Sequence, residues 1–500
     1  MLADRGGTMT TLGTNRSRPT AARAASAIET RSIDYVPDSE RHGKVWQQGP
    51  FWFLGNFQFF TIAIGFLGPA MGLTLGYSIL AGTLGIVFGT FFMAFHATQG
   101  AKLGLPQMIQ SRAQFGYRGV VVVLFASLFT FMAFNVVDTI LIDGGLNGIF
   151  GWNATLVGIV INVAAAALAI YGHDWLHKVF RLLFVVSLPF YIILTIAIIS
   201  GGAGGTAPTE GGFTLAGFMA MCTASAAYNI TYAPYVSDYS RYLPSNTKSV
   251  PIIAAVFLGA SSSAIWLIAI GAWLASHLGA TDGLVALREA GNTAFSGLGT
   301  LLAILSVLAL VATMGLNAYS AMLSALTAID SVHPINPTAR IRVVSIVVIT
   351  VVCAVIGIGF GGNFLDALFT SLVYMLYLLV PWTAVNLVDF FAVRRGHYAV
   401  TDLFTPHGIY GSWGVRGLVS YFIGLLAMLP FAVLPAYPSY TGFMAARLDG
   451  VDYSIVVGLL VSGVLYYVLS RSLDLAAEQP AITASEAALR EQGVPKVEHS

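Results

Sequence analysis

The sequence predicts an all-α integral membrane protein with twelve transmembrane helices, and three observations support this prediction. Hydrophobic residues make up 56% of the 500 positions and charged residues only 9%, which is far from the composition of soluble proteins. Charge-free windows of about 20 residues, the length at which a helix crosses the hydrocarbon core, recur along the chain. The Lys and Arg residues also fall into alternate loops, as expected for a protein that crosses the membrane many times.

The predicted spans follow one another along the chain. The first apolar window, from Val45 to Ala101, is long enough for two helices that separate near residues 76–78. Each later window fits one helix, and these windows cover residues 119–141, 154–171, 179–200, 213–236, 250–276, 297–328, 343–360, 364–389, 417–437 and 453–470. The predicted twelve-helix domain therefore occupies residues 45–470, with polar tails at 1–44 and 471–500.

The basic residues predict the orientation of these helices. With an even number of helices and a cytoplasmic N-terminus, 22 of the 24 Lys and Arg residues lie on the cytoplasmic side, and only Arg288 and Arg447 fall in outer loops. Cytoplasmic loops carry such an excess in multi-pass proteins. We therefore expect both tails to be cytoplasmic, the N-terminal one disordered, and the protein to lie in the plasma or inner membrane. No cleavable signal peptide is expected, because the first apolar stretch begins near Phe51 behind a polar tail.

Several function classes are excluded by the same pattern. The net charge of +1 gives no argument for nucleic-acid binding, because the basic residues mark topology. Cys222 and Cys353 fall inside predicted spans, so a disulfide framework or a thiolate metal site is not expected. The loops carry no zinc, phosphate-loop or nucleophile-elbow motif, and no carboxylate pair or histidine cluster faces one cavity. We therefore expect no enzyme activity and no cofactor.

Two predicted helices contain helix-breaking residues. The first span gathers Gly65, Gly68, Pro69 and Gly72 in its middle, and the sixth is interrupted by Pro234. Breaks in corresponding helices of two halves are typical of inverted-repeat transporters, whose substrate and coupled ion bind near the midplane. Helices one and six correspond if each half has five helices. The alternative is that these residues only permit close helix packing.

Asp138 is a carboxylate within an otherwise apolar span, FMAFNVVDTILIDGG. A charged group at this depth is costly and is by default a functional candidate. It is expected to bind an amino or ring N–H group of a ligand or to carry a coupled proton, and the alternative is a structural pairing with helix six or eight. Asn135 and Thr139 lie within about one turn of it and are expected to share its face.

Three segments resemble the nucleobase:cation symporter-1 family, in particular its purine and cytosine permease branch. They are KLGLPQMIQSRAQFGYRG (Lys102 to Gly119), SDYSRYLP (Ser237 to Pro244) and PWTAVNLVDFFAVRRGHY (Pro381 to Tyr398). The resemblance implies a leucine-transporter-type fold of two inverted five-helix repeats plus two peripheral helices. It also implies cation-coupled uptake of a flat nitrogenous ring, by alternating access.

The resemblance also implies a set of substrate-binding residues. Counting back from Asp238 places the stacking aromatic of the family on Tyr228, with a second aromatic position at Tyr232. Amide and polar positions of the family fall on Gln58, Asn135, Thr139 and Asn317. Asp138 departs from the family pattern, in which the corresponding residue is apolar. Each of these side chains has a structural alternative as a buried, hydrogen-bonded core residue.

The family resemblance also implies that the coupled cation is H⁺ or Na⁺. Sodium-coupled relatives place two neighbouring hydroxyls in helix eight, and the aligned positions here are Ala312 and Thr313. Because one hydroxyl is missing from a possible sodium site near Thr313, protons carried by Asp138 are favoured over sodium.

The expected function is symport of cytosine or purine bases. The nearest alternatives are another ring compound, such as allantoin or hydantoin, a cationic vitamin such as thiamine, and a transporter-like nutrient receptor without net flux. The expected partners are a small nucleobase-like molecule and membrane lipid. Nothing in the sequence fixes the oligomeric state.

Overall fold

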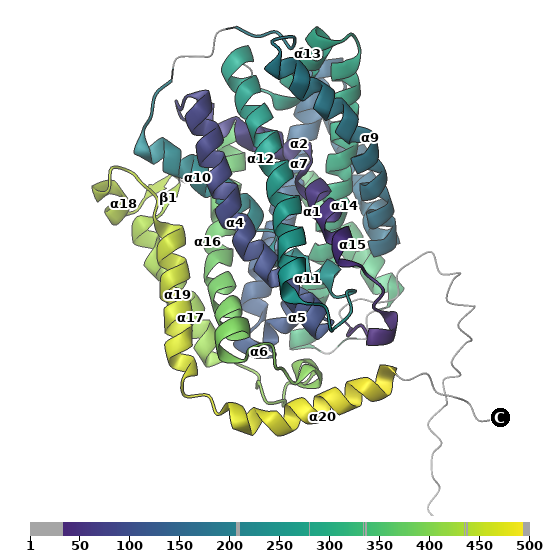
Figure 1. Cartoon of the computed structure of the whole chain (residues 1–500), viewed down its shortest axis with the longest axis vertical. Coiled ribbons are helices and arrows are strands. Elements are labelled where there is room, and N and C mark those ends of the chain that lie inside the picture. The colour runs from purple at the N-terminus through teal and green to yellow at the C-terminus, as the bar shows by residue number, and fades with distance from the viewer. Residues whose placement is uncertain are drawn as a thin grey trace, which may run out of the picture.

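The computed structural model describes residues 34–206, 211–279, 281–333, 335, 338–434, 436 and 439–493. Long helices run side by side in one bundle, with shorter helices across its two ends (Figure 1). The predicted disorder of residues 1–33 lies outside the described residues.

Eight single helices are long and apolar enough to span a bilayer. They are α4 (Leu75–Leu103), α7 (Val121–Phe150), α8 (Ala154–Tyr171), α9 (His173–Ile199), α12 (Ser249–Leu278), α14 (Leu298–Val332), α15 (Ala339–Gly359) and α16 (Phe364–Val388). Each of them overlaps one of the predicted apolar windows, and α7 (Val121–Phe150) extends beyond its window of 119–141. At its C-terminal end α16 continues as one π-helical turn, Asp389–Val393.

Four further segments complete the bundle in the described part of the chain. Two are broken: α1 (Gln48–Asn56) is followed by α2 (Phe59–Gly65) and α3 (Leu67–Ala70), and α10 (Leu215–Ile230) is followed by α11 (Ala233–Ser240). The other two are α17 (Val415–Met428) and α19 (Ser454–Ser470). Twelve apolar segments are thus present, in agreement with the predicted number.

The main break in the first span does not lie where its composition predicted it, although a one-residue interruption at Phe66 separates α2 from α3. The chain bends by 59° between α1 and α2, at Phe57 and Gln58, well before the Gly65 to Gly72 cluster. The break in the sixth span lies at Thr231 and Tyr232, directly before Pro234 at the start of α11. Proline is well tolerated in a first helical turn, so this second break was predictable and the first was not.

The glycines of the first span serve helix packing instead. A Cβ atom at Gly65 would overlap the carbonyl oxygen of Ile268 on α12, and one at Gly271 would overlap the carbonyl oxygen of Ile62. The backbones of α2 and α12 therefore cross in direct contact. Small residues permit this close approach in membrane proteins, which is the alternative interpretation of the cluster.

Replacing Gly65 by alanine is therefore expected to destabilise the protein by about 1–3 kcal/mol, because the added methyl group forces the two backbones apart. Gly76, near the start of α4, has open space around its Cβ position, and Gly76→Ala is expected to change stability by less than about 1 kcal/mol. Unfolding of both purified variants in detergent measures the difference. Equal stability of the two variants would contradict the packing role of Gly65.

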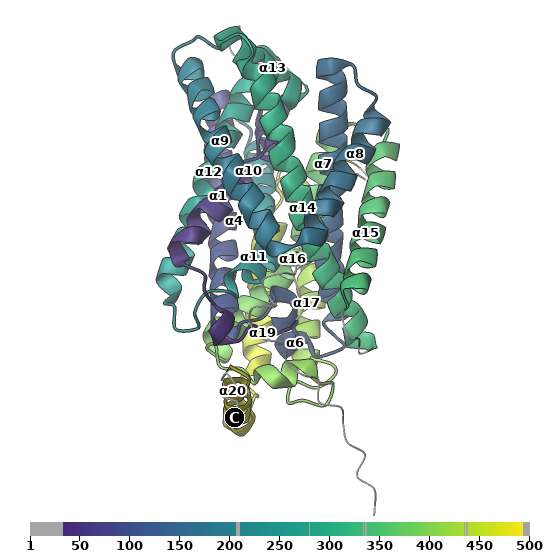
Figure 2. The same ribbon diagram turned by 90° about the vertical axis from the view of Figure 1, so that its right-hand side faces the viewer.

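The bundle has two sides, and the broken segment α10–α11 belongs to the first of them. On one side α4 packs against α10, α11 and α12, and on the other α7 packs against α8, α14 and α15. Figure 2 shows α8 and α15 at the edge of the second side. The candidate functional site lies where α2 and the α10–α11 break meet α7 and α14.

The two ends of the bundle differ. At one end lies α13 (Gly283–Ala294), together with α18 (Phe443–Arg447) and a two-stranded hairpin of β1 (Val433–Leu434) and β2 (Tyr440–Thr441). At the other end lie the short helices α5 (Gln107–Gln110) and α6 (Arg112–Phe115) and the long α20 (Leu475–Gly493), which crosses the end of the bundle (Figure 1).

The prediction of disorder fails for the last residues of the N-terminal tail. From Asp34 to Lys44 the chain is packed against the end of α4. Val36 is fully buried and its N–H donates to the carbonyl oxygen of Gly104 at 2.9 Å, while Arg41 donates to the carbonyl oxygen of Ala101 at 2.9 Å. For the C-terminus we predicted only a tail at 471–500. In the structure most of this tail forms α20.

Candidate functional site

Two helix breaks meet in the centre of the bundle. The α1–α2 break consists of Phe57 and Gln58, with Gln58 fully extended at φ −147° and ψ 165°. The α10–α11 break consists of Thr231 and Tyr232. Irregular backbone at membrane depth persists only where protein or water satisfies its polar groups. The side chains around the breaks supply such partners.

Amide side chains fasten the two breaks to each other and to the neighbouring helices. Asn56 Nδ2 donates to Asn229 Oδ1 at 2.8 Å and to the carbonyl oxygen of Ala260 at 2.9 Å. Asn229 Nδ2 in turn donates to the hydroxyl of Thr90 at 2.6 Å. These contacts join α1 and α10 to α12 and α4.

Gln58, Tyr228 and Tyr232 form a hydrogen-bonded cluster at the breaks. Gln58 Nε2 lies 3.0 Å from the Tyr228 hydroxyl, 3.2 Å from the Tyr232 hydroxyl and 3.2 Å from the carbonyl oxygen of Gly55. The hydroxyls of Thr61 and Tyr228 lie 2.7 Å apart. The structure therefore brings together three of the residues that the sequence nominated.

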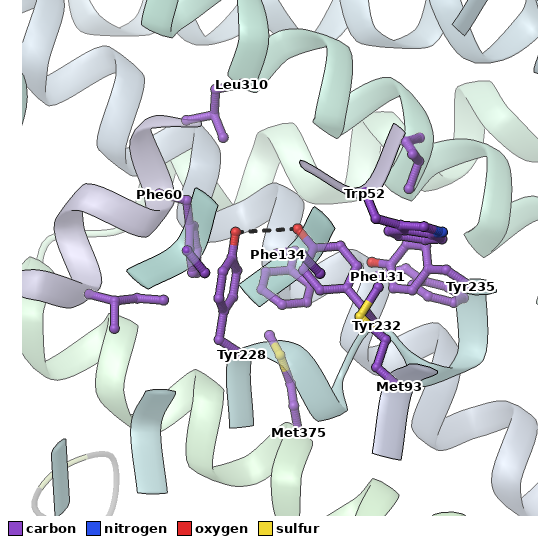
Figure 3. Packing of buried hydrophobic residues seen from close by; sticks show 14 of the residues in the cluster. Trp52, Phe60, Met93, Phe131, Phe134, Tyr228, Tyr232, Tyr235, Leu310 and Met375 are labelled. Atoms are coloured by element: carbon purple, nitrogen blue, oxygen red, sulfur yellow. Dashed lines mark hydrogen bonds between the residues drawn. The ribbon is translucent and has the colours of Figure 1, made fainter. Parts of the chain in front are cut away.

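Aromatic rings surround this cluster, as Figure 3 shows. The Phe60 ring lies nearly parallel to that of Tyr228, with centroids 5.5 Å apart and planes at 16°. The Phe134 ring lies nearly parallel to that of Tyr232, at 6.0 Å and 23°. Trp52 presents its ring to Tyr232 at 6.0 Å and 71°. Flat aromatic faces of this kind stack on planar ligands.

A chain of amides links the second broken helix to α14 and α7. The Tyr235 hydroxyl donates to Asn317 Oδ1 at 2.6 Å, and Asn317 Nδ2 donates to Asn135 Oδ1 at 2.9 Å. Asn135 Nδ2 donates to the carbonyl oxygen of Met314 at 3.1 Å, which is the last hydrogen bond of this series. The two predicted amide positions are thus in direct contact with each other.

Asp138 lies one helical turn beyond Phe134 on α7, so the two residues share a face. Its carboxyl group is buried with 1% of the residue exposed, and within the described residues neither oxygen has a hydrogen-bond partner. It interacts electrostatically with Tyr228, Tyr232 and Tyr235. A buried carboxylate without a partner is costly.

Two of the nominated residues lie apart from this cluster. The Thr139 hydroxyl donates to the carbonyl oxygen of Asn135 at 2.7 Å and accepts from Asn162 of α8 at 2.9 Å. Thr313 donates to the carbonyl oxygen of Ala309 at 3.2 Å, within α14. Thr139 therefore joins α7 to α8, and the structure shows no contact of Thr313 with the aromatic cluster among the described residues.

The site is buried in this structure. None of the eight nominated residues is more than 3% exposed. Phe51, Trp52 and Tyr239 pack together in one layer, with Phe51 and Tyr239 at 4.8 Å and Trp52 reaching Tyr232. Beyond Phe51 and Tyr239 lies a cavity of about 210 Å³ at the end of the bundle where α1 begins. This layer therefore separates the cluster from that cavity.

Sequence reasoning missed the aromatic residues that enclose the cluster. Phe60, Phe134 and Tyr235 were not nominated, although each contacts a nominated tyrosine or amide. In an apolar window an aromatic residue of the site looks like any lipid-facing or core residue. The spacing of Tyr235 could have identified it, because it follows Tyr228 by seven residues in the same broken span, which is about two helical turns.

The three segments that carry the family resemblance meet at the end of the bundle near α5 and α6, away from the aromatic cluster. Asp238 accepts from the backbone N–H of Gln107 at 2.9 Å, and Gln107 Nε2 donates to Gln99 Oε1 at 2.9 Å. Gln99 Nε2 then donates to Asn386 Oδ1 at 2.6 Å. One polar network therefore joins α4, α5, α11 and α16.

Asp389 is the centre of the neighbouring network. Its carboxylate accepts from Gln114 at 2.6 Å, Tyr398 at 2.7 Å and Tyr466 at 2.8 Å, and it pairs with Arg394 at 2.6 Å. Arg394 also makes a two-pronged contact with Glu478 of α20, at 2.9 and 2.8 Å. The C-terminal helix is thereby attached to the end of α16.

A family model described as a permease for cytosine and purines, uracil, thiamine and allantoin matches residues 35–458. A purine-cytosine permease of Bacillus subtilis, YxlA, described as putative, is 33% identical over 447 residues, which are 89% of this chain and 96% of that protein. The chain belongs to the nucleobase:cation symporter-1 family. It is a multi-pass membrane permease and not an enzyme.

Two further proteins are less similar in sequence to this member of the nucleobase:cation symporter-1 family. The purine-cytosine permease FCY2 of Saccharomyces cerevisiae is 23% identical over 257 residues, which are 50% of this chain and 48% of that protein. Mhp1, a transporter of the same family solved in a closed conformation with bromovinylhydantoin bound, superposes with a TM-score of 0.70 at 18% identity, over 92% of this chain and 100% of that one. This likeness confirms the predicted leucine-transporter-type fold.

Proposed function

We propose that this permease is a secondary active transporter that imports cytosine or purine bases together with a cation. The cluster of Tyr228, Gln58 and the Asn317–Asn135 pair is the observation that carries this proposal. An aromatic face suits a flat heterocycle. Side-chain amides both donate and accept, which suits the alternating donors and acceptors of a nucleobase edge.

The position of the cluster supports transport by alternating access. It lies between the two sides of the bundle at the paired breaks, which is where inverted-repeat transporters bind substrate. The layer of Phe51, Trp52 and Tyr239 blocks one route from the site, and movement of α1 or α11 would open it. A transporter needs such a closed state between its two open ones.

The coupled cation is H⁺ or Na⁺. Asp138 is the candidate proton carrier, because it is the unpartnered carboxylate beside the aromatic cluster. Thr313 is the candidate sodium ligand, and its neighbour Ala312 offers no second hydroxyl. Sodium takes several oxygen ligands, so we favour the proton. We place both termini in the cytoplasm and the protein in the plasma or inner membrane, because 22 of 24 basic residues then lie inside.

A second candidate function is transport of another ring compound. The description of the family model includes thiamine and allantoin, and the Asp138 carboxylate would be an apt partner for the positive charge of thiamine. Such a ligand would use the same aromatic faces. A nutrient receptor that binds such a ligand without net flux would use the same site. Only a measurement of transport distinguishes it from a transporter.

Equilibrium binding to the purified protein tests which ligand the site takes. We expect cytosine or adenine to displace a labelled nucleobase at micromolar concentration, and allantoin, hydantoin and thiamine to require at least about 100-fold more, because a site with paired polar groups rejects rings that leave them unpaired. Binding of thiamine, allantoin or hydantoin in preference to every nucleobase would overturn the proposal in favour of the second candidate.

A further inference from the structure

Within the described residues, three acceptor atoms beside Tyr228 have no hydrogen-bond partner. They are Gln58 Oε1 and both carboxylate oxygens of Asp138, and all three are buried. The nearby donors, in contrast, are occupied by the tyrosine hydroxyls, Asn317 and backbone carbonyls. Buried polar groups normally have partners, so a ligand of this site is expected to supply donors.

The orientations of the amides are fixed by backbone carbonyl oxygens, so this pattern does not depend on the assignment of amide nitrogen and oxygen. Gln58 Nε2 lies against the carbonyl oxygen of Gly55, and Asn135 Nδ2 lies against that of Met314. A carbonyl oxygen only accepts hydrogen bonds, so it requires the NH₂ side of each amide. The free atom of Gln58 is therefore its oxygen.

Asp138 lies within reach of a ring that stacks in the cluster. Phe134, one turn before it on α7, packs edge-on against Tyr228 at 6.3 Å and parallel to Tyr232 at 6.0 Å. No lysine, arginine or histidine among the described residues forms an ion pair with Asp138 within 4.0 Å. The groups that face it are tyrosines, and these already donate to other partners. A ligand is thus the remaining source of donors for its carboxylate.

Nucleobases differ at the position where such a donor would sit. Cytosine and adenine carry an exocyclic amine, whereas uracil and hypoxanthine carry a carbonyl oxygen at the equivalent carbon. An amine donates to a carboxylate in a charge-assisted hydrogen bond. A carbonyl oxygen in its place faces the carboxylate with no proton between them, which leaves both acceptors buried and unpaired.

We infer that the site selects amino-substituted nucleobases over their oxo counterparts, with the exocyclic amine donating to Asp138. This inference rests on the proposed function and narrows its substrate class. The aromatic ring stacks on Tyr228, and Gln58 Oε1 accepts a second N–H of the base. Asp138 is then a specificity-determining residue in its ionised form.

Binding of two matched pairs of bases to the purified full-length protein tests the inference. We expect cytosine to bind at least about 100-fold more tightly than uracil, and adenine at least about 100-fold more tightly than hypoxanthine. In Asp138→Asn the side chain is uncharged and offers a donor as well as an acceptor, so both ratios are expected to fall below about 10-fold. Asp143→Asn removes a carboxylate nearer the end of the same helix and is expected to leave both ratios unchanged.

The outcomes separate the inference from the proposed function. Failure of the wild-type protein to bind any of the four bases would overturn the proposed function, and the inference with it. Equal binding of the amino and oxo members by the wild type would overturn the inference alone, as would an unchanged ratio in a folded Asp138→Asn protein. If that variant does not fold, Asp138→Glu, which keeps the carboxylate, is expected to retain the amino preference, and loss of the preference would contradict the inference.

Discussion

Tyr228→Ala is expected to weaken binding of cytosine or adenine by about 30-fold. Stacking of one base on an aromatic side chain contributes about 1–3 kcal/mol, as alanine substitutions show, and about 2 kcal/mol corresponds to this change in affinity. The Tyr228 ring is fully buried between Phe60 and Phe134, so its removal takes away the face on which the base rests. Equilibrium binding to the purified variant measures the loss.

Two control variants separate stacking from general damage. Tyr228→Phe keeps the ring and loses only the hydroxyl contacts to Gln58 and Thr61, so it is expected to keep most of the affinity. Tyr421 on α17 is 2% exposed and donates to the carbonyl oxygen of Leu378, and Tyr421→Ala removes an equally large buried ring outside the site. The stacking role is wrong if both alanine variants change the affinity by the same factor.

Asp389→Ala is expected to destabilise the protein by about 3–5 kcal/mol, because it leaves Arg394 buried without its closest counter-charge. Arg394 is 7% exposed and lies 2.6 Å from Asp389. The same change strips hydrogen-bond partners from Gln114, Tyr398 and Tyr466. Unfolding of the purified variant by a denaturing detergent measures the loss of stability.

An exposed ion pair provides the comparison for Asp389. Glu486 and Arg490 pair at 3.8 Å on α20, with side chains 56% and 83% exposed. Surface pairs of this kind contribute about 0–1 kcal/mol, so Glu486→Gln is expected to unfold like the wild type. Wild-type stability of Asp389→Ala would show that the network does not hold this end of the bundle together.

The helices were predictable because membrane-spanning helices appear in the sequence as charge-free apolar windows between loops that carry the charges. A charge-free window such as 297–328 corresponds to α14, and the alternation of basic loops distinguishes twelve spans from eleven or thirteen. The first helix break was not predictable, because Phe57 and Gln58 carry no glycine or proline. The Gly65 to Gly72 cluster holds only a one-residue interruption at Phe66, between α2 and α3, and its glycines permit contact with α12 and α4. Composition alone does not separate these two uses of glycine.

The candidate site was predictable in part. The family resemblance nominated Gln58, Tyr228, Tyr232, Asn135 and Asn317, and the structure brings these side chains into one hydrogen-bonded and aromatic cluster. Thr139 was grouped with Asn135 by helical spacing, yet it contacts α8. Spacing identifies neighbours on one helix but does not tell which neighbouring helix the residue faces.

The enclosing rings could not have been predicted in the same way. Phe60 and Phe134 sit in apolar windows with many other phenylalanines, among 32 in the chain. Only the three-dimensional contacts distinguish the two that pack on Tyr228 and Tyr232. Asp138 was singled out as an isolated carboxylate in an apolar span, and its lack of a hydrogen-bond partner among the described residues became visible only in the structure.

Accumulation of labelled cytosine in proteoliposomes, under an imposed pH gradient or an imposed sodium gradient, tests the central claim most directly. We predict that the internal concentration rises above the external one when the outside is acidic, and that the sodium gradient alone has no such effect. Accumulation driven only by sodium would assign the coupling to Na⁺ in place of H⁺. Binding of cytosine without accumulation under either gradient would contradict symport and favour a receptor.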